Sequence, residues 1–174
     1  LGAGGTWPGE IALQFSPNIP QTFINNLRAG IIIVAGTNGK TTTTLLIKRI
    51  LEKKGFNVVH NDSGANLLNG IVSAYIQNSD WLGKMIADWG VFETDENTLP
   101  IFSEQLYEFS TSSNKKRVIV VLLNLFRDQL DRYGEVDVIA QKWEKALSKL
   151  PENTTLVLNA DDPLIAHLGK EVSK

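Results

Sequence analysis

A run of β-branched residues followed by a glycine-rich turn and a helical pattern constrains the fold of this chain more than any other feature. Residues 31–35 read Ile-Ile-Ile-Val-Ala with glycine on both sides, and such a run is typical of a strand buried on both faces of a parallel sheet. Leucine and isoleucine then recur at helical spacing through residues 40–54, which end in a basic turn before Gly55. The segment therefore predicts a strand, a glycine turn and a helix in succession.

The same alternation continues to the end of the chain. It predicts strands at residues 31–35, 56–60, 89–92, 118–123 and 155–158, and helices at 40–54, 66–77, 101–109, 138–150 and 163–168. Strands that alternate with helices of this length form parallel α/β sheets with right-handed crossovers. We therefore expect an α/β domain, with a parallel sheet flanked by helices, over residues 31–174. Residues 1–30 would precede it as an N-terminal arm, either a surface segment or a short helix.

The composition excludes several classes of site. The 174 residues include no cysteine, so disulfides, thiol nucleophiles and thiolate metal sites are excluded from this segment. The 17 Lys and Arg stand against 19 Asp and Glu with no basic block, which argues against nucleic acid as a partner. The apolar runs are too short to span a bilayer, and no signal peptide is visible. A start without methionine suggests a piece of a longer chain.

The turn after the first strand has the composition of a phosphate-binding loop, Gly-Thr-Asn-Gly-Lys-Thr at residues 36–41. Its glycines let backbone N–H groups approach phosphate oxygens, and the helix N-terminus adds partial positive charge. Lys40 would reach the β- and γ-phosphates of a nucleotide, and the Thr41 hydroxyl would bind Mg²⁺. An ordinary glycine turn with a capping threonine is the alternative, but the position between strand and helix favours nucleotide binding. The general Walker A pattern has glycine where this chain has Val34, so the loop is a shortened variant.

The sequence Gly-Thr-Asn-Gly-Lys-Thr-Thr at residues 36–42 resembles the loop of the Mur ligase superfamily, ATP-dependent enzymes that join an amine to a carboxylate. Further segments are similar to one branch, the MurT-type subunits of lipid II isoglutaminyl synthase; they lie at residues 4–18, 61–70, 124–135 and 158–163. The resemblance covers almost the whole chain and implies a P-loop-containing Mur ligase central domain. That domain would be incomplete here, because the branch also has a four-cysteine zinc ribbon and a C-terminal domain.

Glu93 is the metal ligand that the resemblance implies. It ends a predicted strand at the carboxyl edge of the sheet, where ligands bind in open α/β folds. In the superfamily a glutamate at this strand end holds Mg²⁺. The alternative is a solvated acidic loop shared with Asp95 and Glu96.

Asn159 and Asp162 follow the last predicted strand and match a motif that faces the nucleotide in relatives. A helix N-cap at Asp161 or Asp162, with Pro163 in the first turn, explains the same residues equally well. The expected site therefore has Lys40 and Glu93 as catalytic residues and Thr41 and Glu93 as Mg²⁺ ligands. The expected nucleotide contacts are Gly36, Thr37, Asn38, Gly39, Lys40, Thr41, Thr42, Asn159 and Asp162.

Two positions bear on which branch the chain resembles. Amino-acid-adding Mur ligases usually carry a metal-binding histidine where this chain has Gln129, and a neutral amide oxygen is a weaker ligand for a hard cation. They also carry a carbamylated lysine about one helix further on. Lys142 is the nearest candidate but lies slightly out of register, and an exposed helix lysine is the alternative. Gln129 therefore favours the amidating branch.

The resemblance implies a reaction in peptidoglycan biosynthesis. ATP and Mg²⁺ would activate the α-carboxylate of D-glutamate in the lipid II stem peptide as an acyl phosphate, and ammonia would convert it to D-isoglutamine. The ammonia would come from a glutaminase partner of the GatD type, since this chain has no cysteine nucleophile. Zn²⁺ is expected only in the full-length protein. The protein would work in the bacterial cytoplasm, meeting the inner face of the membrane only through its lipid-linked substrate.

Alternatives from two classes stay open. One is an amino-acid-adding Mur ligase or a folylpolyglutamate synthase-like ligase; the former has a UDP-sugar-binding domain before the loop, whereas only residues 1–30 precede the first strand here. The other is a nucleotide-binding interaction or switch module without ligase chemistry. We also expect this chain by itself to bind nucleotide weakly and not to amidate.

Overall fold

The centre of the fold is a parallel β-sheet. The computed structural model describes residues 6–61, 64–111, 116–126 and 135–172. Within these ranges the sheet has five strands in the order β2-β3-β1-β4-β5, and all neighbouring pairs run parallel. The strands are β1 (Gly30–Ala35), β2 (Val58–His60), β3 (Trp89–Thr94), β4 (Arg117–Leu122) and β5 (Thr155–Leu158). The predicted α/β fold with a parallel sheet is confirmed.

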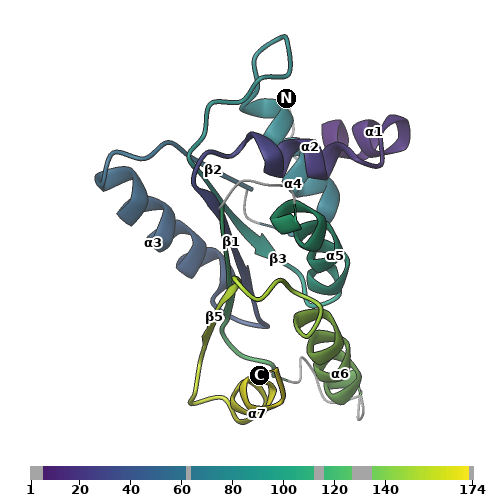
Figure 1. The fold of residues 1–174 in the computed structure, drawn as a ribbon, viewed down its shortest axis with the longest axis vertical. Coiled ribbons are helices and arrows are strands. Elements are labelled where there is room, and N and C mark those ends of the chain that lie inside the picture. The colour runs from purple at the N-terminus through teal and green to yellow at the C-terminus, as the bar shows by residue number, and fades with distance from the viewer. Residues whose placement is uncertain (1–5, 62–63, 112–115, 127–134, 173–174) are drawn as a thin grey trace.

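Helices cover the two faces of the sheet unequally. The helices are α1 (Trp7–Phe15), α2 (Ile19–Asn26), α3 (Lys40–Lys53), α4 (Leu68–Gln77), α5 (Thr98–Thr111), α6 (Glu135–Leu147) and α7 (Pro163–Val172). Helix α3 lies on one side of the sheet, and α2, α4 and α5 lie on the other (Figure 1). In the described ranges no helix is both long enough and apolar enough to cross a membrane.

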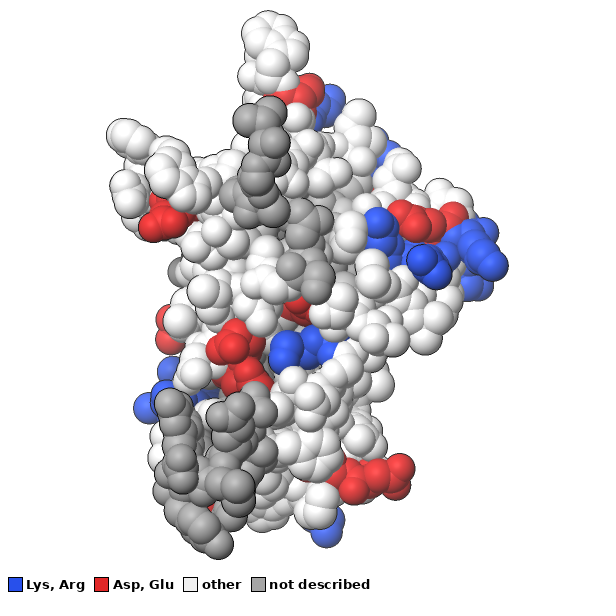
Figure 2. Space-filling model, turned by 180° about the vertical axis from the view of Figure 1, so that it is seen from behind, with Lys and Arg blue, Asp and Glu red and all other residues white. Residues whose placement is uncertain are grey.

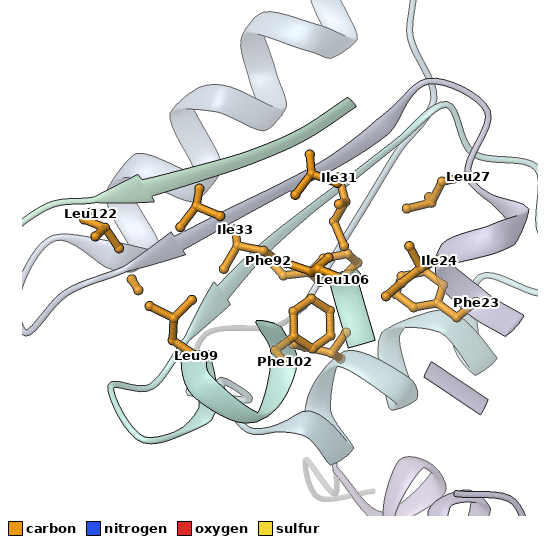
Figure 3. Packing of buried hydrophobic residues seen from close by; sticks show 14 of the residues in the cluster. Phe23, Ile24, Leu27, Ile31, Ile33, Phe92, Leu99, Phe102, Leu106 and Leu122 are labelled. Carbon is orange, nitrogen blue, oxygen red and sulfur yellow. The ribbon is translucent and has the colours of Figure 1, made fainter. Parts of the chain in front are cut away.

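The larger core lies between the sheet and the helices on the side opposite α3 (Figure 3). Ile31 and Ile33 of β1 point into it, while Ile32 and Val34 pack on the α3 side. Because the central strand β1 is buried on both faces, both sets of its side chains must be apolar. The rings of Phe23 and Phe92 meet edge to face, 5.3 Å apart, in this core.

The first thirty residues contribute to this core. Residues 7–15 and 19–26 form α1 and α2, so the short-helix interpretation is confirmed, whereas the surface-segment alternative is wrong for α2 because three of its residues are buried. Phe23, Ile24 and Leu27 are completely buried, and their spacing places them on one side of a helix. Helix α1 packs closely on α4 at Gly9, whose N–H donates to Ser73 Oγ at 2.8 Å.

Some predicted boundaries differ from the structure. Strand β2 begins at Val58 rather than at residue 56, because Asn57 turns to bond the Asp88 carboxylate through its N–H. Helix α4 begins at Leu68, and α6 covers 135–147 rather than 138–150. Helix α6 ends where the Ser148 hydroxyl bonds back to the Glu144 carbonyl at 2.8 Å. These shifts leave the order of elements as predicted.

The chain path creates a crevice at the carboxyl edge of the sheet. Strands β1 and β3 are neighbours, yet β1 leads into α3 on one face and β3 leads into α5 on the other. In open α/β sheets, ligands bind where adjacent strands send their connections to opposite faces. The fold therefore places the loop after β1 and the end of β3 side by side at the edge where a ligand is expected.

Candidate nucleotide site

The glycine-rich loop joins β1 to α3, as predicted. Gly36 and Gly39 have φ of 146° and 85°, in the range that side chains with a Cβ rarely adopt. Gly39 is the N-cap of α3, and no side chain caps that helix end. The first N–H groups of α3 therefore keep the free hydrogen-bonding capacity that an anion uses at a helix N-terminus. Thr42 lies in the first turn of α3 and is exposed.

The Lys40 side chain turns back over this loop. Its Nζ donates to the carbonyl oxygens of Gly36, at 2.5 Å, and Thr37, at 3.0 Å. Both acceptors are neutral, and among the described residues no carboxylate forms an ion pair with the ammonium, which therefore brings positive charge to the mouth of the loop. A polyphosphate is the kind of ligand that such a charge attracts.

Thr41 and Glu93 come together in the crevice. The Thr41 hydroxyl donates to Glu93 Oε2 at 2.6 Å, and the Gly64 N–H donates to Oε1 at 3.1 Å. Glu93 is only 2% exposed, so the solvated-loop alternative is wrong for this residue. Asp95 and Glu96 instead form the turn before α5, where the Asp95 carbonyl accepts from two later N–H groups.

This pair of oxygen ligands fits a magnesium ion that also binds nucleotide. Mg²⁺ prefers oxygen and is commonly held by one or two protein ligands together with phosphates and water. In the described part of the chain, no group of three or more His, Cys, Asp or Glu residues is placed to hold a metal by itself. Thr41 and Glu93 would thus bind Mg²⁺ jointly with the phosphates that Lys40 attracts.

Asn124 clamps the loop from the side of β4. Its Oδ1 accepts from the Asn38 N–H at 2.8 Å, and its Nδ2 donates to the Asn38 carbonyl at 3.0 Å. The Asn124 carbonyl accepts from the Thr37 N–H at 3.1 Å. The Thr37 hydroxyl accepts from the Phe126 N–H and donates to the Phe126 carbonyl. These contacts fix the backbone of Thr37 and Asn38, two of the predicted nucleotide-binding residues.

We expect Asn124→Ala to weaken nucleotide binding about tenfold, because two hydrogen bonds that hold the loop in its binding conformation are lost. The loss should be equal with and without Mg²⁺, since Asn124 contacts the loop and not Glu93. Calorimetric titration of the complete protein with ATP measures both affinities. Asn78→Ala is the matched control, because Asn78 also bonds a backbone carbonyl, that of Ala74, but at the end of α4. Equal affinities for the Asn124 and Asn78 variants would contradict the clamp.

Asn61 was missed by the sequence analysis, as was Asn124. Asn61 follows β2 directly and is 3% exposed. Its amide bonds both the N–H and the carbonyl of Glu93, at 3.0 and 2.9 Å. Each of these asparagines directly follows a predicted strand and begins a segment that resembles the MurT-type subunits, but neither signal gave it a role in the site.

Asp162 and Asn159 lie further along the same edge, after β5. Asp162 is 3% exposed, and its Oδ1 accepts from the N–H groups of Leu164 and Ile165 at the start of α7. This geometry supports the N-cap interpretation, and a nucleotide contact for Asp162 stays a prediction. Asn159 is exposed, and its Nδ2 donates to the Leu123 carbonyl at 2.8 Å. Its nucleotide contact also stays a prediction.

Of the two positions that distinguish amino-acid-adding enzymes, the structure describes only Lys142. Gln129 lies outside the described residues. Lys142 is exposed on α6, and its Nζ is 3.4 Å from Asn97 Oδ1. This exposure and the contact with a neutral amide agree with the interpretation of Lys142 as an exposed helix lysine.

Charged side chains around the fold are mixed in sign. Figure 2 shows acidic and basic groups interspersed on the face seen there, with the largest group over the end of α3. On α3, Lys48 and Glu52 form an ion pair with Nζ and Oε1 3.7 Å apart. Electrostatic attraction for a phosphate ligand therefore comes from the loop itself, through Lys40 and the N-terminus of α3.

Comparison with known proteins identifies the domain that carries this site. The family described as Mur ligase middle domain matches residues 34–174. The chain belongs to the Mur ligase family. Among curated Mur ligase relatives it is 39% identical, over 165 residues, to the MurT subunit of the glutamine-hydrolysing lipid II isoglutaminyl synthase of Streptococcus pneumoniae (strain ATCC BAA-255 / R6). It is 36% identical over 169 residues to the same subunit of Staphylococcus aureus (strain COL).

These alignments cover 94% and 97% of this Mur ligase chain but only 34% and 35% of the relatives. The chain thus spans about a third of their length. It is also 30% identical to the UDP-N-acetylmuramoylalanine–D-glutamate ligase of Pelotomaculum thermopropionicum (strain DSM 13744 / JCM 10971 / SI), over 81% of this chain and 27% of that enzyme.

Solved structures of Mur ligases share the fold. A crystal structure of MurF from Acinetobacter baumannii has a TM-score of 0.64 at 16% identity, covering 88% of this chain and 30% of that one. MurF ligase from Thermotoga maritima, solved in complex with ADP, has a TM-score of 0.59 at 19% identity, covering 88% and 32%. At these identities the likeness establishes the fold alone.

Proposed function

We propose that this chain is the ATP-binding part of a ligase that amidates the α-carboxylate of D-glutamate in the lipid II stem peptide, forming D-isoglutamine. The arrangement of Lys40, Thr41 and Glu93 at one crevice carries the ATP-dependent part of this proposal. Similarity to the MurT subunits supports the choice of substrate. The resulting role is in peptidoglycan biosynthesis.

The residues of the crevice have distinct tasks in this reaction. The α3 N-terminus and Lys40 would hold the phosphates of ATP. Thr41 and Glu93 would hold Mg²⁺, which would supply charge stabilisation for the transferred phosphoryl group. A carboxylate oxygen of the substrate attacks the γ-phosphorus, and ADP leaves. Ammonia then attacks the acyl carbon, and inorganic phosphate leaves as the amide forms and a proton is released.

The ammonia source is a separate subunit in this proposal. The relatives are named as subunits of a glutamine-hydrolysing synthase, and this chain contains no cysteine to act as a glutaminase nucleophile. We infer a glutaminase partner of the GatD type. The complex would act in the cytoplasm at the inner face of the membrane, where the lipid-linked substrate is presented. We also propose that residues 31–174 are an incomplete Mur ligase-like central domain, with Zn²⁺ expected only in the full-length protein.

An assay of the complete gene product tests this function. Lipid II, ATP, Mg²⁺ and glutamine are supplied with and without the neighbouring glutaminase, and conversion of carboxylate to carboxamide is followed by mass spectrometry. With glutamine as the nitrogen source, we expect product only when both subunits and ATP are present. Ammonium salts should replace both glutamine and the partner, so that product then forms with ATP and this subunit alone. ATP consumption without carboxamide formation under all these conditions would contradict the proposal.

Addition of an amino acid is the second candidate function. The 30% identity to a D-glutamate-adding ligase favours it. The same protein preparation is therefore offered UDP-N-acetylmuramoylalanine and D-glutamate in place of lipid II and ammonia. Turnover of ATP with this pair alone would establish the second candidate and show that the interpretation of Gln129 was wrong.

A further inference from the structure

Asn61 occupies a position that the proposed reaction does not yet use. It lies one residue beyond β2, at the carboxyl edge of the sheet, and 3% of it is exposed. Its Oδ1 accepts from the Glu93 N–H at 3.0 Å, and its Nδ2 donates to the Glu93 carbonyl at 2.9 Å. Nδ2 also donates to the Ala65 carbonyl at 2.7 Å. One N–H and two carbonyl groups therefore use both donors and one acceptor lone pair of a buried amide, and they fix which of its ends is oxygen.

These contacts continue the β-sheet by means of a side chain. The paired register of β2 and β3 ends where His60 stands opposite Val91. Beyond that point the Asn61 amide supplies the donor and acceptor that a further strand residue would have offered to Glu93. The backbone of Glu93 is therefore held from both sides, by β1 through the pairing of Val34 with Glu93 and by Asn61.

The third contact positions the group that orients the Glu93 carboxylate. Asn61 bonds the carbonyl of Ala65, the residue next to Gly64. The Gly64 N–H donates to Glu93 Oε1 at 3.1 Å. The other oxygen, Oε2, is left to Thr41. Asn61 thus fixes both the main chain of Glu93 and the neighbour that selects which carboxylate oxygen faces Thr41.

We propose that Asn61 is a positioning residue that sets the Glu93 carboxylate for Mg²⁺ in the nucleotide complex. The proposal rests on the proposed function, because it takes Glu93 as a Mg²⁺ ligand. Partners that orient a metal ligand typically change metal affinity or activity about 10- to 100-fold when removed. The hydrogen bonds of Asn61 go to Glu93 and Ala65 and not to the phosphate loop. Substitution of Asn61 should therefore change Mg²⁺ affinity and leave the affinity for Mg²⁺-free nucleotide unchanged.

The test compares the unsubstituted complete protein with Asn61→Ala and Asn61→Ser. Asn61→Ala removes all three hydrogen bonds, and Asn61→Ser retains a hydroxyl that restores part of the pairing. Calorimetry gives the ATP affinity with and without Mg²⁺, and a Mg²⁺ titration of ATP turnover gives the half-saturating concentration. We expect Asn61→Ala to raise that concentration at least about tenfold, with Asn61→Ser in between and the Mg²⁺-free ATP affinity unchanged.

A merely structural role for Asn61 predicts another outcome. In that case the substitutions would lower the melting temperature and the amount of active protein, but the half-saturating Mg²⁺ concentration (the Mg²⁺ midpoint) of the folded protein would not change. That result in either variant overturns the proposal. Asn78→Ala is the matched control, since it loses an amide-to-backbone bond at the opposite end of α4 and should not move the midpoint.

Glu93→Gln separates this proposal from the function on which it rests. If Glu93→Gln leaves the Mg²⁺ midpoint unchanged, the metal assignment of the proposed function is wrong. If Glu93→Gln shifts the midpoint but neither Asn61 variant does, the function stands and the positioning role is overturned. The Asn124→Ala variant, which should weaken ATP binding equally with and without Mg²⁺, shows that the two measurements respond independently.

Discussion

Lys40→Ala is expected to lower ATP turnover about 100- to 1,000-fold, the loss that follows removal of one charged or polar group stabilising a reacting centre. Within the described part of the chain, Lys40 Nζ donates only to the carbonyl oxygens of Gly36 and Thr37. Its charge is therefore available to the β- and γ-phosphates, where negative charge is redistributed as the phosphoryl group is transferred. The effect should appear in both ATP affinity and maximal rate.

The measurement is steady-state ATP turnover by the complete protein with its acceptor and ammonia source. Lys53→Ala is the matched control, because Lys53 is an exposed lysine in the last turn of the same helix. It should retain full turnover apart from a small loss of helix stability. Undiminished turnover in Lys40→Ala would mean that the loop after β1 is not where ATP reacts.

The order of strands and helices was predictable because strands that are buried on both faces consist of continuous apolar runs, which are easily recognised in the sequence. Residues 31–35 of β1 and the alternating buried side chains of β4 are apolar since helices or sheet neighbours cover them. The boundaries of α4 and α6 were less accurate, because a helix end is decided by local bonds such as that from Ser148 to Glu144. The burial of Phe23 and Ile24 depends on packing between distant segments, which the glycine- and proline-rich composition of residues 1–30 obscured.

The centre of the site was predictable for a different reason. Phosphate binding needs glycine at Gly36 and Gly39 and a lysine next to the helix start, so these residues are recognisable in the sequence. Asn61 and Asn124 were not recognisable, because their role is to bond backbone atoms about 32 and 86 residues away in the chain. Asparagine in a loop is so common that only the folded arrangement distinguishes such a clamp from an ordinary turn.

Asp162→Ala is expected to destabilise the fold by about 3 kcal/mol, because it leaves several buried N–H groups without an acceptor. Asp162 Oδ1 accepts from Leu164 and Ile165, at 2.9 and 3.0 Å. Oδ2 accepts from the Leu125 N–H at 3.0 Å. One buried carboxylate therefore caps α7 and ties it to the segment after β4, so that its loss affects two elements at once.

Substitutions at and beside Asp162 distinguish capping from nucleotide contact. Asp162→Asn retains an oxygen for the α7 cap but turns an NH₂ group toward the Leu125 N–H, so it should recover only part of the lost stability. Asp161→Ala is the control, because Asp161 is exposed and the bond found for it is from its own backbone N–H to Asn159. Urea unfolding of the complete protein measures all three. A variant of Asp162 that keeps full stability but loses ATP affinity would show instead that the carboxylate serves the nucleotide, since a cap cannot be removed from a buried helix start without a cost in free energy.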